Sequence, residues 1–535
     1  MHGHHLHVVC LSRCNHSASN MIVVALLLVG VVALYLYGTR NHNYWKERGV
    51  KHDKPIPIFG TDAKRYLLQS SIAQRAADTY WKYPGERFVG YFRGSIPELV
   101  IRDPDLVKRI ITTDFSYFYS RGLSPAHKVI EPLLRNLFFA DGDLWRLLRQ
   151  RMTSAFTSGK LKAMFPLIVE RAEKLQARLL DAAAAGRPID ARELMARYTT
   201  DFIGACGFGL DADSLNDDSS PFRKLGMKIF KIDLKRCIVI FCKTIFPDIF
   251  KSLKFLGQEL EDDILALVNQ IQKQRNYKPS GRNDFIDFLM EWQQRGKILV
   301  ESLEETNPDG TPKTVELEMD DVLVAAQAFI FFAAGFETSS SATSFTLHQL
   351  AFHPEVQKKA QADIDRVLAR HNNRLSYEAV KEMTYLDWVL QEGMRIFPSS
   401  GMLLRQCVRP YTIPGTDITI DKGVKINIPL VALHNDPQYF DNPKEFRPER
   451  FEPEEVAKRH KFVYLPFGDG PRSCIGGRLG QMQSLAGLAA VLAKFSVAPA
   501  PDTKRELESD PTSSIVQNIV GGIPLMFHAR HAPPA

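Results

Sequence analysis

The distribution of apolar and charged positions near the N-terminus predicts a membrane helix. Residues 21–37 form a run of 17 residues without a charged side chain, which as an α-helix would be about 26 Å long. That length is near the lower limit for crossing a bilayer. More basic residues follow the run than precede it, with Arg13 upstream and Arg40, Lys46, Arg48, Lys51 and Lys54 downstream. Because positive residues stay on the cytosolic side, we expect an anchor whose attached domain faces the cytosol.

We expect the chain to consist of four parts: a leader of uncertain status (1–20), the anchor (21–37), a proline-containing linker (38–60) and one large domain (61–535). A cleaved signal peptide is the alternative for 21–37, but no small-residue cleavage site follows Tyr37. The histidines and cysteines of the leader could be drawn as a metal site, yet a polar leader has no core to organise ligands. We therefore expect no metal there, and Met21 as the functional start. Pro55 and Pro57 predict a stiff, extended linker.

The pattern along the body predicts mainly helices with a small β subdomain. Residues 319–350 form a long apolar stretch without proline, in which Gly335 predicts a local distortion. Residues 386–397 and 475–495 predict two further helices. The β-branched residues within 404–429 predict strands, and 515–527 resembles a hairpin turning at Gly521-Gly522.

Composition and charge narrow the class of protein. The chain of 535 residues is 45% hydrophobic and 24% charged, which is typical of a globular protein with a large core. Its seven cysteines have no regular spacing, so we expect a reducing compartment and no disulfide framework. A net charge of +7 favours anionic lipid or an acidic protein partner. No nucleic-acid recognition motif is present, so nucleic acid is not an expected partner.

A second segment is aromatic and basic. Residues 227–257 carry five phenylalanines among seven Lys or Arg and only two Asp. Such a segment is typical either of a surface that dips into lipid or of a buried helix pair with a basic outer face. The predicted anchor favours lipid contact.

Residues 467–476, Phe-Gly-Asp-Gly-Pro-Arg-Ser-Cys-Ile-Gly, carry the most specific chemistry. Glycines at 468, 470 and 476 allow tight turns and close approach to a flat partner. Amide groups and the start of a following helix would stabilise the Cys474 thiolate, and Arg472 brings a positive charge two residues before it. A lone cysteine is usually a small buried hydrophobe. The complete pattern instead indicates that Cys474 is the axial ligand of a haem iron.

This loop resembles the haem-binding loop of the cytochrome P-450 haem-thiolate monooxygenases, and other motifs of that family follow in order. Glu392 and Arg395 form its Glu-x-x-Arg pair, and Arg450 lies in the segment that supplies a second arginine to the carboxylate. Residues 334–339, Ala-Gly-Phe-Glu-Thr-Ser, match the long helix over the haem. The resemblance implies the cytochrome P-450 fold, mainly α with a small β subdomain and an N-terminal transmembrane helix.

The resemblance also implies roles for single residues. Haem b would be held by the Cys474 thiolate, within a loop that includes Phe467, Gly468 and Gly476. Thr338 would deliver protons to bound dioxygen and Glu337 would relay them from solvent, although a threonine in a helix can simply bond back to a carbonyl. Glu392, Arg395 and Arg450 would form a structural charge network. The haem propionates would contact Trp145, Arg149, Arg405 and Arg472, and also Arg121, for which a surface cation is an equal alternative.

Electrons must come from a partner, because the sequence contains no dinucleotide or nucleotide motif. The resemblance implies NADPH used indirectly through an acidic flavoprotein, the NADPH-cytochrome reductase, with cytochrome b5 as a second candidate donor. Basic residues that could dock such a partner are Arg146, Arg151, Lys444, Arg447, Lys461 and Arg478.

Three stretches, 45–50, 222–226 and 413–417, are similar to microsomal members from insects whose relatives oxidise plant toxins and insecticides. We therefore expect an endoplasmic-reticulum protein with its catalytic domain on the cytosolic face and an apolar small-molecule substrate. Ser399 stands where a second proline is usual, and Gly477 is unusually small, which affects the expected pocket shape. A haem-thiolate isomerase or dehydratase and a non-catalytic haem sensor remain as alternatives, and the Glu337-Thr338 pair argues against the first of these.

Overall fold

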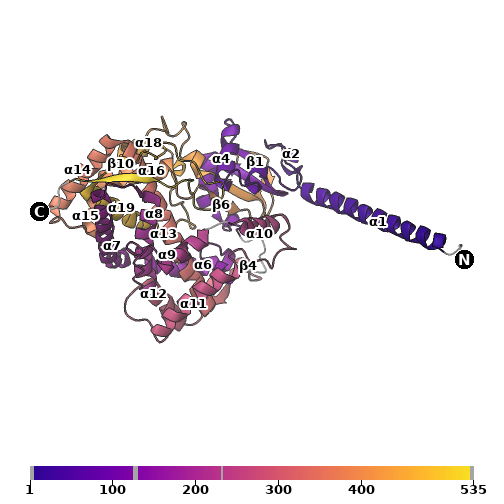
Figure 1. Ribbon diagram of the computed structural model, residues 1–535, viewed down its shortest axis with the longest axis horizontal. Helices are drawn as coiled ribbons and strands as arrows, with labels where there is room; N and C mark the ends of the chain where they lie inside the picture. Colours follow the sequence, from indigo (N-terminus) through magenta and orange to yellow (C-terminus); the bar gives the residue numbers. More distant parts are fainter. Residues whose placement is uncertain (1–4, 124–130, 231–232, 531–535) are drawn as a thin grey trace.

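The computed structural model describes residues 5–123, 131–230 and 233–530, with side chains described from residue 21 onward. Most of the chain forms a helical body, and a smaller lobe built around β1, β2, β6 and β9 adjoins it (Figure 1). Each part has its own cluster of buried apolar side chains. The long helix α1 projects from the β lobe, on the side of the molecule opposite the C-terminus. The predicted fold class, mainly α with a small β part, is confirmed.

The α-helices are α1 (His5–Thr39), α2 (Tyr44–Glu47), α3 (Ala63–Tyr66), α4 (Ile72–Lys82), α5 (Pro104–Lys108), α6 (Gly142–Met152), α7 (Ser158–Ala184), α8 (Ala191–Ile203), α9 (Pro221–Phe230), α10 (Leu234–Ile245), α11 (Gln258–Gln274), α12 (Phe285–Gln294), α13 (Asp321–Phe352), α14 (Pro354–Arg370), α15 (Tyr377–Glu382), α16 (Thr384–Ile396), α17 (Leu430–Leu433), α18 (Pro453–Lys458) and α19 (Gly477–Lys494). Shorter π or 3-10 turns are η1 (Arg109–Thr113), η2 (Phe115–Tyr117), η3 (Pro132–Leu134), η4 (Thr153–Phe156), η5 (Gly204–Phe208), η6 (Pro448–Phe451) and η7 (Lys461–Val463). The strands are β1 (Phe88–Arg93), β2 (Ile96–Ile101), β3 (Ile189–Asp190), β4 (Ile298–Thr306), β5 (Pro312–Leu317), β6 (Leu403–Gln406), β7 (Tyr411–Thr412), β8 (Thr419–Ile420), β9 (Lys425–Ile428), β10 (Phe495–Pro499) and β11 (Pro524–Ala529).

The strands form one mixed sheet and three smaller antiparallel sheets. The order of the mixed sheet is β1-β2-β9-β6, in which β2 and β9 are parallel and the other pairs antiparallel. The strands predicted within 404–429 are therefore confirmed. The hairpin predicted at 515–527 is wrong, because β11 pairs with β10 and β3 instead of the residues before the turn. Gly521 and Gly522 do turn the chain, each with positive φ, but β10 offers a five-residue register that outcompetes the short preceding segment.

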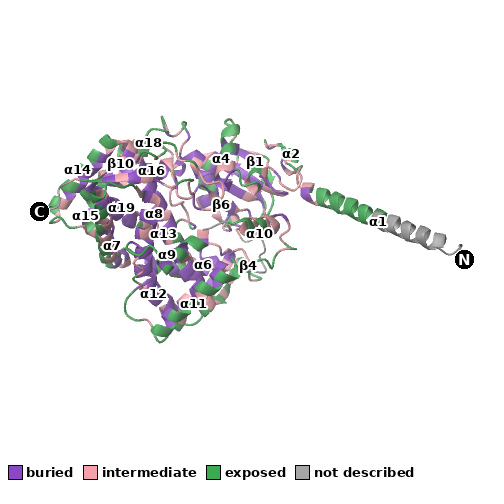
Figure 2. Cartoon of the chain, viewed as in Figure 1, coloured by how far each residue is buried: buried purple, intermediate pink, exposed green. Residues whose placement is uncertain are grey.

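The apolar run 21–37 lies within α1, and its large side chains are exposed from Met21 to Leu36, whereas Tyr37 is half-buried (Figure 2). By length and hydropathy this helix is a candidate membrane span. α13 passes the same test, but most of it is buried inside the protein, so it is a core helix. The side chains of the leader 1–20 lie outside the described residues, so the expectation about a metal site there stays a prediction.

The linker 38–60 is neither extended nor detached from the body. Ile56 and Gly60 exchange backbone hydrogen bonds of 2.8 and 2.7 Å, which closes a tight turn and corrects the predicted stiff segment. Ile58 takes a positive φ of 69° inside this turn. Trp45 is completely buried, and its indole Nε1 donates to the Tyr91 carbonyl at 3.1 Å. The Trp45 contact therefore ties the segment that follows α1 to the β lobe.

The predicted long helices are confirmed as α13, α16 and α19, each within two residues of the expected ends. α13 packs along α8 and also against α16 and α19, which places it at the centre of the helical body. The expected distortion at Gly335 is absent, since α13 runs as one continuous α-helix. A Cβ on Gly335 would instead collide with the Ile203 side chain of α8. Close helix packing therefore explains this glycine.

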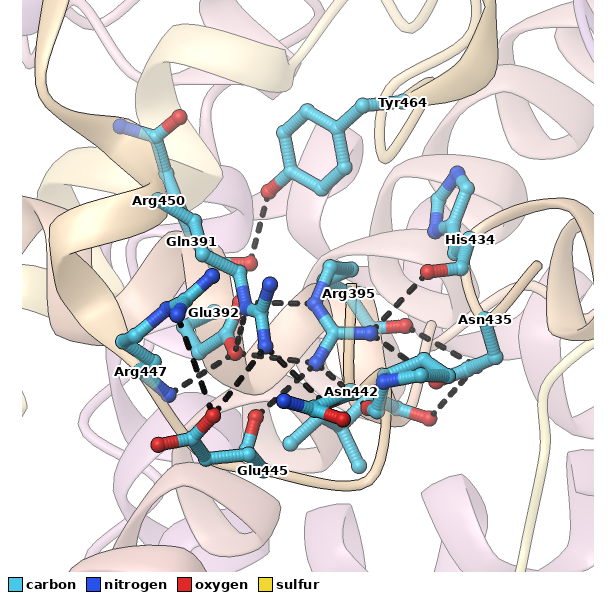
Figure 3. Close-up of polar contacts among 12 residues, drawn as sticks. Gln391, Glu392, Arg395, His434, Asn435, Asn442, Glu445, Arg447, Arg450 and Tyr464 are labelled. Atoms are coloured by element: carbon cyan, nitrogen blue, oxygen red, sulfur yellow. Dashed lines mark hydrogen bonds and ion pairs between the residues drawn. The ribbon is translucent and has the colours of Figure 1, made fainter. Parts of the chain in front are cut away.

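A buried charge network joins α16 to the segment that leads to η6 (Figure 3). Arg395 Nε lies 2.7 Å from Glu392 Oε2, and Arg450 Nε lies 3.3 Å from Glu392 Oε1. The three side chains are 0%, 0% and 3% exposed. Arg395 also donates to the backbone carbonyls of His434 and Pro443. Every charge in the group has a partner of opposite sign or a carbonyl, so the network can hold two distant segments together without a ligand.

We expect Glu392→Ala to destabilise the fold by about 3–5 kcal/mol, because the two arginines would remain buried without their carboxylate. The measurement is the free energy of unfolding in urea together with the yield of folded, haem-containing protein. Glu445→Ala is the matched control, since the Glu445 side chain is about half exposed and lies only at the edge of the network. Its loss should cost less than about 1 kcal/mol. Equal stability of both variants would contradict the network.

Candidate functional site

The loop 467–476 holds Cys474 at the start of α19. Gly468 and Gly470 both have positive φ, at 68° and 72°, and a Cβ on Gly470 would collide with the Ile111 carbonyl. The Cys474 amide donates to the Phe467 carbonyl at 2.8 Å, which closes the loop on itself. Only glycine fits these two positions without strain. Gly476 is the N-cap residue of α19, so the predicted helix start behind the cysteine is confirmed.

The Cys474 thiol has an exposed surface although protein atoms surround it. Burial raises the pKa of this thiol, while a hydrogen bond from the Gly476 amide and the charges of Arg149 and Arg121 act to lower it. The Arg472 guanidinium, which is expected to bring positive charge near the sulfur, forms an ion pair with Asp141, so its effect on the thiol stays a prediction. The hydrogen-bond donor and the two cations offset the effect of burial only in part, so the pKa of the free thiol lies above its usual value, and a metal bound to the sulfur would have to displace the proton.

Four arginines gather at this loop, and the Asp141 carboxylate forms an ion pair with one of them, Arg472. Arg472 donates through Nη2 to Asp141 Oδ1 at 2.7 Å and through Nε to the Tyr119 carbonyl at 2.7 Å. Arg149 donates to the Ser473 carbonyl at 2.7 Å. Arg121 donates to the Phe138 carbonyl at 2.8 Å. Arg405, on β6, donates to the Leu404 carbonyl at 2.8 Å.

Trp145 belongs to the same cluster. It lies one helical turn before Arg149 on α6, as its spacing predicts, and it is buried. The Arg472 guanidinium stands 4.3 Å from the centre of its ring, close enough for a cation–π interaction. The structure therefore brings together Trp145, Arg121, Arg149, Arg405 and Arg472 from four separate segments, since Trp145 and Arg149 share α6. Arg121 is partly buried and its guanidinium donates to the Phe138 carbonyl, while its contact with a propionate stays a prediction.

The positive charge of this cluster is not balanced by the protein. Burial lowers the pKa of Arg405 to about 9 and that of Arg121 to about 10, and repulsion between neighbouring arginines adds to the effect. Arg405 Nε and Arg472 Nη1 are buried with no hydrogen-bond partner. Buried donors and cations are costly unless an anion pairs with them. The two unpaired donors of Arg405 and Arg472, close to the Cys474 thiol, fit a cofactor that carries carboxylates and an iron able to bind a thiolate, as haem does.

The middle of α13 carries the other candidate residues. Thr338 Oγ1 donates back to the Ala334 carbonyl at 2.7 Å, and Ala334 itself is exposed. The Ser399 hydroxyl donates to the Thr338 carbonyl at 3.0 Å, so the residue that replaces the usual second proline contacts this helix directly. Glu337 is buried and forms an ion pair with Arg192 of α8. The acid and the alcohol are therefore adjacent in sequence but engaged with different partners.

Asp141 and Arg192 are functional candidates that the sequence did not reveal. Asp141 accepts from the backbone amides of Arg121 and Gly122 as well as from Arg472. Its position directly before α6 is the one available signal, since acidic residues favour helix N-termini. Arg192 lies far from Glu337 in sequence, and no local pattern links the two residues.

We expect Arg405→Gln to accelerate haem loss, because one of the unpaired buried donors would no longer face the cofactor's carboxylates. A charge-assisted hydrogen bond contributes about 1.5–3 kcal/mol, so haem affinity should fall by roughly tenfold or more. The measurement is the rate of haem transfer to an apo-globin scavenger. Arg409→Gln is the control, because Arg409 lies outside the cluster and bonds to the Ser116 hydroxyl. An unchanged transfer rate in Arg405→Gln would argue against its assignment.

Comparison with known proteins agrees with this geometry. The family model described as Cytochrome P450 matches residues 51–525. Cytochrome P450 6a2 of Drosophila melanogaster is 38% identical, and the match covers 94% of this chain and 99% of that protein. Cytochrome P450 6B6 of Helicoverpa armigera is 36% identical over 92% of this chain and 95% of its own length. Cytochrome P450 6k1 of Blattella germanica is 35% identical over 95% and 96%. The chain therefore belongs to the cytochrome P450 family of haem-iron monooxygenases.

Proposed function

We propose that this protein is a membrane-anchored monooxygenase that inserts one oxygen atom of O2 into apolar small molecules, with Cys474 as the thiolate ligand of the haem iron. The observation that carries the proposal is the accessible Cys474 thiol, which receives a hydrogen bond from the Gly476 amide beside a cluster of incompletely paired arginines. Xenobiotics, plant toxins, insecticides and endogenous lipids or hormones are the substrate classes that fit an apolar pocket.

Haem bound through a thiolate supplies the activation of O2 that oxygen insertion requires. The residues of the chain would hold and orient it. Arg405 and Arg472 offer their free donors to the propionates, and Arg121, Arg149 and Trp145 complete that side. Gly468 and Gly476 let the loop backbone approach a flat ring, and Phe467 packs beside Gly477 behind the sulfur.

Oxygen activation also consumes protons, and Thr338 is the residue we assign to their delivery. Its hydroxyl can donate and accept at once, and Ala334, four residues earlier on the same face of α13, is exposed. The Ser399 hydroxyl holds the Thr338 carbonyl and so fixes this turn of the helix. Glu337 would bring protons from solvent to the Thr338 hydroxyl.

Electrons would come from NADPH through the acidic flavoprotein reductase, or from cytochrome b5. Arg149 connects α6 to the backbone of the cysteine loop through the Ser473 carbonyl, which makes α6 a suitable docking face. Several basic residues expected to attract the partner are already paired, including Arg146 with Glu301 and Lys461 with Asp469. The surface charge offered to a partner is correspondingly smaller than the sequence alone indicates.

We place the protein in the endoplasmic reticulum membrane with the catalytic domain on the cytosolic face. The end of the anchor contacts the aromatic, basic segment directly, since the Tyr37 ring stacks on Phe246 at 5.1 Å and its hydroxyl donates to the Ile245 carbonyl. Leu234 and Ile249 in this segment are each 70% exposed. Exposed apolar side chains next to the anchor support lipid contact by α10 and the segment that follows it, and apolar substrates could then enter from the bilayer.

The direct test of this function is Cys474→Ala. We expect the variant to lose the thiolate-type carbon-monoxide difference spectrum and all NADPH-dependent oxygenation, because no other group would replace the sulfur. Cys242→Ala, a partly exposed cysteine on α10, should keep both and serves as the control. A Cys474→Ala protein with the parental spectrum would refute the ligand assignment. Absence of NADPH consumption by the parent protein with reductase and substrate would favour an isomerase, dehydratase or sensor.

Thr338→Ala should separate oxygen activation from substrate binding. We expect an unchanged carbon-monoxide spectrum and substrate-induced spectral shift, with peroxide formed per NADPH rising several-fold because proton delivery is impaired. Thr346→Ala is a closely matched control, since Thr346 makes the same 2.7 Å bond back to a carbonyl four residues earlier on α13. Equal coupling of electrons to product in Thr338→Ala and the parent would leave the hydroxyl with a purely structural role.

The membrane topology can be tested by protease digestion of sealed microsomes. We expect the domain after residue 38 to be digested without detergent, because the basic residues that follow the anchor stay in the cytosol. A lumenal protein of the same microsomes is the control for sealing. A domain that stays protected until detergent is added would reverse the orientation. A chain that begins at Met21 should behave in the same way.

A further inference from the structure

The hairpin formed by β4 and β5 packs against α6, the helix that carries Trp145 and Arg149 (Figure 1). Between residues 298 and 317 this hairpin has five acidic residues and one lysine. α6 has the opposite composition, with three arginines and one aspartate. An acidic element of the chain therefore lies on the helix that is the proposed docking face for an acidic partner.

The hairpin has a buried base and an exposed tip. Every second residue from Ile298 to Ser302 is buried, so one face of β4 belongs to the core. The Asp143 carboxylate of α6 accepts from the Ser302 hydroxyl at 2.6 Å and from the Leu303 amide at 2.5 Å. The turn and the residues beside it, 304–314, are largely exposed. The base is thus fixed to α6, while the tip reaches into solvent.

Two carboxylates of the hairpin lie against α6. Glu301 Oε2 is 3.3 Å from Arg146 Nη2. The Glu304 carboxylate lies at Gly142, the first residue of the helix, where an added Cβ would collide with it. Negative charge is favourable at both places, because Arg146 is a cation and the N-terminus of a helix carries partial positive charge. The hairpin therefore supplies α6 with the charge that an acidic partner would bring.

The contact between the hairpin and α6 is loose on the side of Glu301. A cavity of about 460 Å³ opens between the two elements, and the charged residues in its lining are Arg146, Arg149 and Glu301. The ion pair between Arg146 and Glu301 is accessible to water, with side chains 34% and 66% exposed. Exposed pairs of this kind are weak. The Glu301 side chain can therefore leave Arg146 while the buried base of the hairpin stays in place.

We propose that the β4–β5 hairpin is an acidic strap, which occupies the docking face of α6 in the free protein and gives up Arg146 when the acidic reductase binds. Arg146 then exchanges the Glu301 carboxylate for a carboxylate of the partner, so one ion pair is broken for the one that forms. The strap weakens partner binding by the strength of the pair that is broken. The inference rests on the proposed delivery of electrons by that reductase at α6.

Glu301→Gln tests the proposal, with Glu316→Gln as the matched control. Glu316 lies on β5 of the same hairpin but pairs with Lys297 instead of with α6, so each variant removes one negative charge from the same element. The measurement is the rate at which the reductase reduces the haem under carbon monoxide, as a function of reductase concentration. We expect Glu301→Gln to lower the half-maximal concentration by about two- to fivefold, the range for an exposed ion pair. Glu316→Gln should stay near the parent, and the maximal rate should be the same in all three proteins.

A double-mutant cycle with Arg146→Gln shows whether Glu301 acts through Arg146. In an Arg146→Gln background, Glu301→Gln should no longer lower the half-maximal concentration. A shift that persists in that background, or equal values for Glu301→Gln and Glu316→Gln, would overturn the strap. Haem reduced with dithionite, which needs no docking, should give the same carbon-monoxide spectrum in every variant. Failure of the proposed function looks different, because the reductase would then not reduce the parent protein at any concentration.

Discussion

The arrangement around Cys474 depends on positive charge that the protein buries without fully compensating it. Four guanidinium groups approach one another with Asp141 as the carboxylate among them, and burial disfavours their charged state. Such a cluster is costly on its own, and the cost is offset when an anionic group binds. The arginines, the accessible thiol and the glycine-rich loop are therefore parts of one binding site, whose stability is coupled to its cofactor.

In the network around Glu392, the protein itself compensates the buried charges. There the buried carboxylate has two arginine partners, Arg395 also reaches backbone carbonyls of the segment 434–445, and Arg450 pairs with Asp441 as well, although its Nε has no hydrogen-bond partner. The charges of this group are compensated inside the protein, so it can set the path of the chain toward the cysteine loop before any cofactor binds. Similar residue types thus serve two purposes, and the difference lies in whether the protein itself supplies the opposite charges.

The sequence predicted those features that depend on local patterns. The apolar run at 21–37, the long helices and the Cys474 loop are each encoded within a few neighbouring residues, and the structure has them at the expected places. The errors concern contacts between distant segments. β11 pairs with β10 instead of with the nearby residues of the predicted hairpin. Gly335 is explained by its close contact with Ile203 of another helix. Neither partner can be identified from the residues around each site, because tertiary packing decides between locally equal alternatives.

The same limit explains why the acid–alcohol pair looked simpler in sequence than in the structure. Residues that are adjacent in the sequence suggest adjacent functional groups. The rotation between consecutive residues of a helix nevertheless directs the Glu337 and Thr338 side chains to different surroundings. Glu337 pairs with Arg192 of α8, whereas Thr338 lies toward the side of α13 that carries the exposed Ala334. α13 thus presents the acid and the alcohol to two different surroundings, with no break in the helix. Because the hydrogen-bonded backbone of a continuous helix offers no path for protons, any transfer between the two groups depends on the movement of side chains or water.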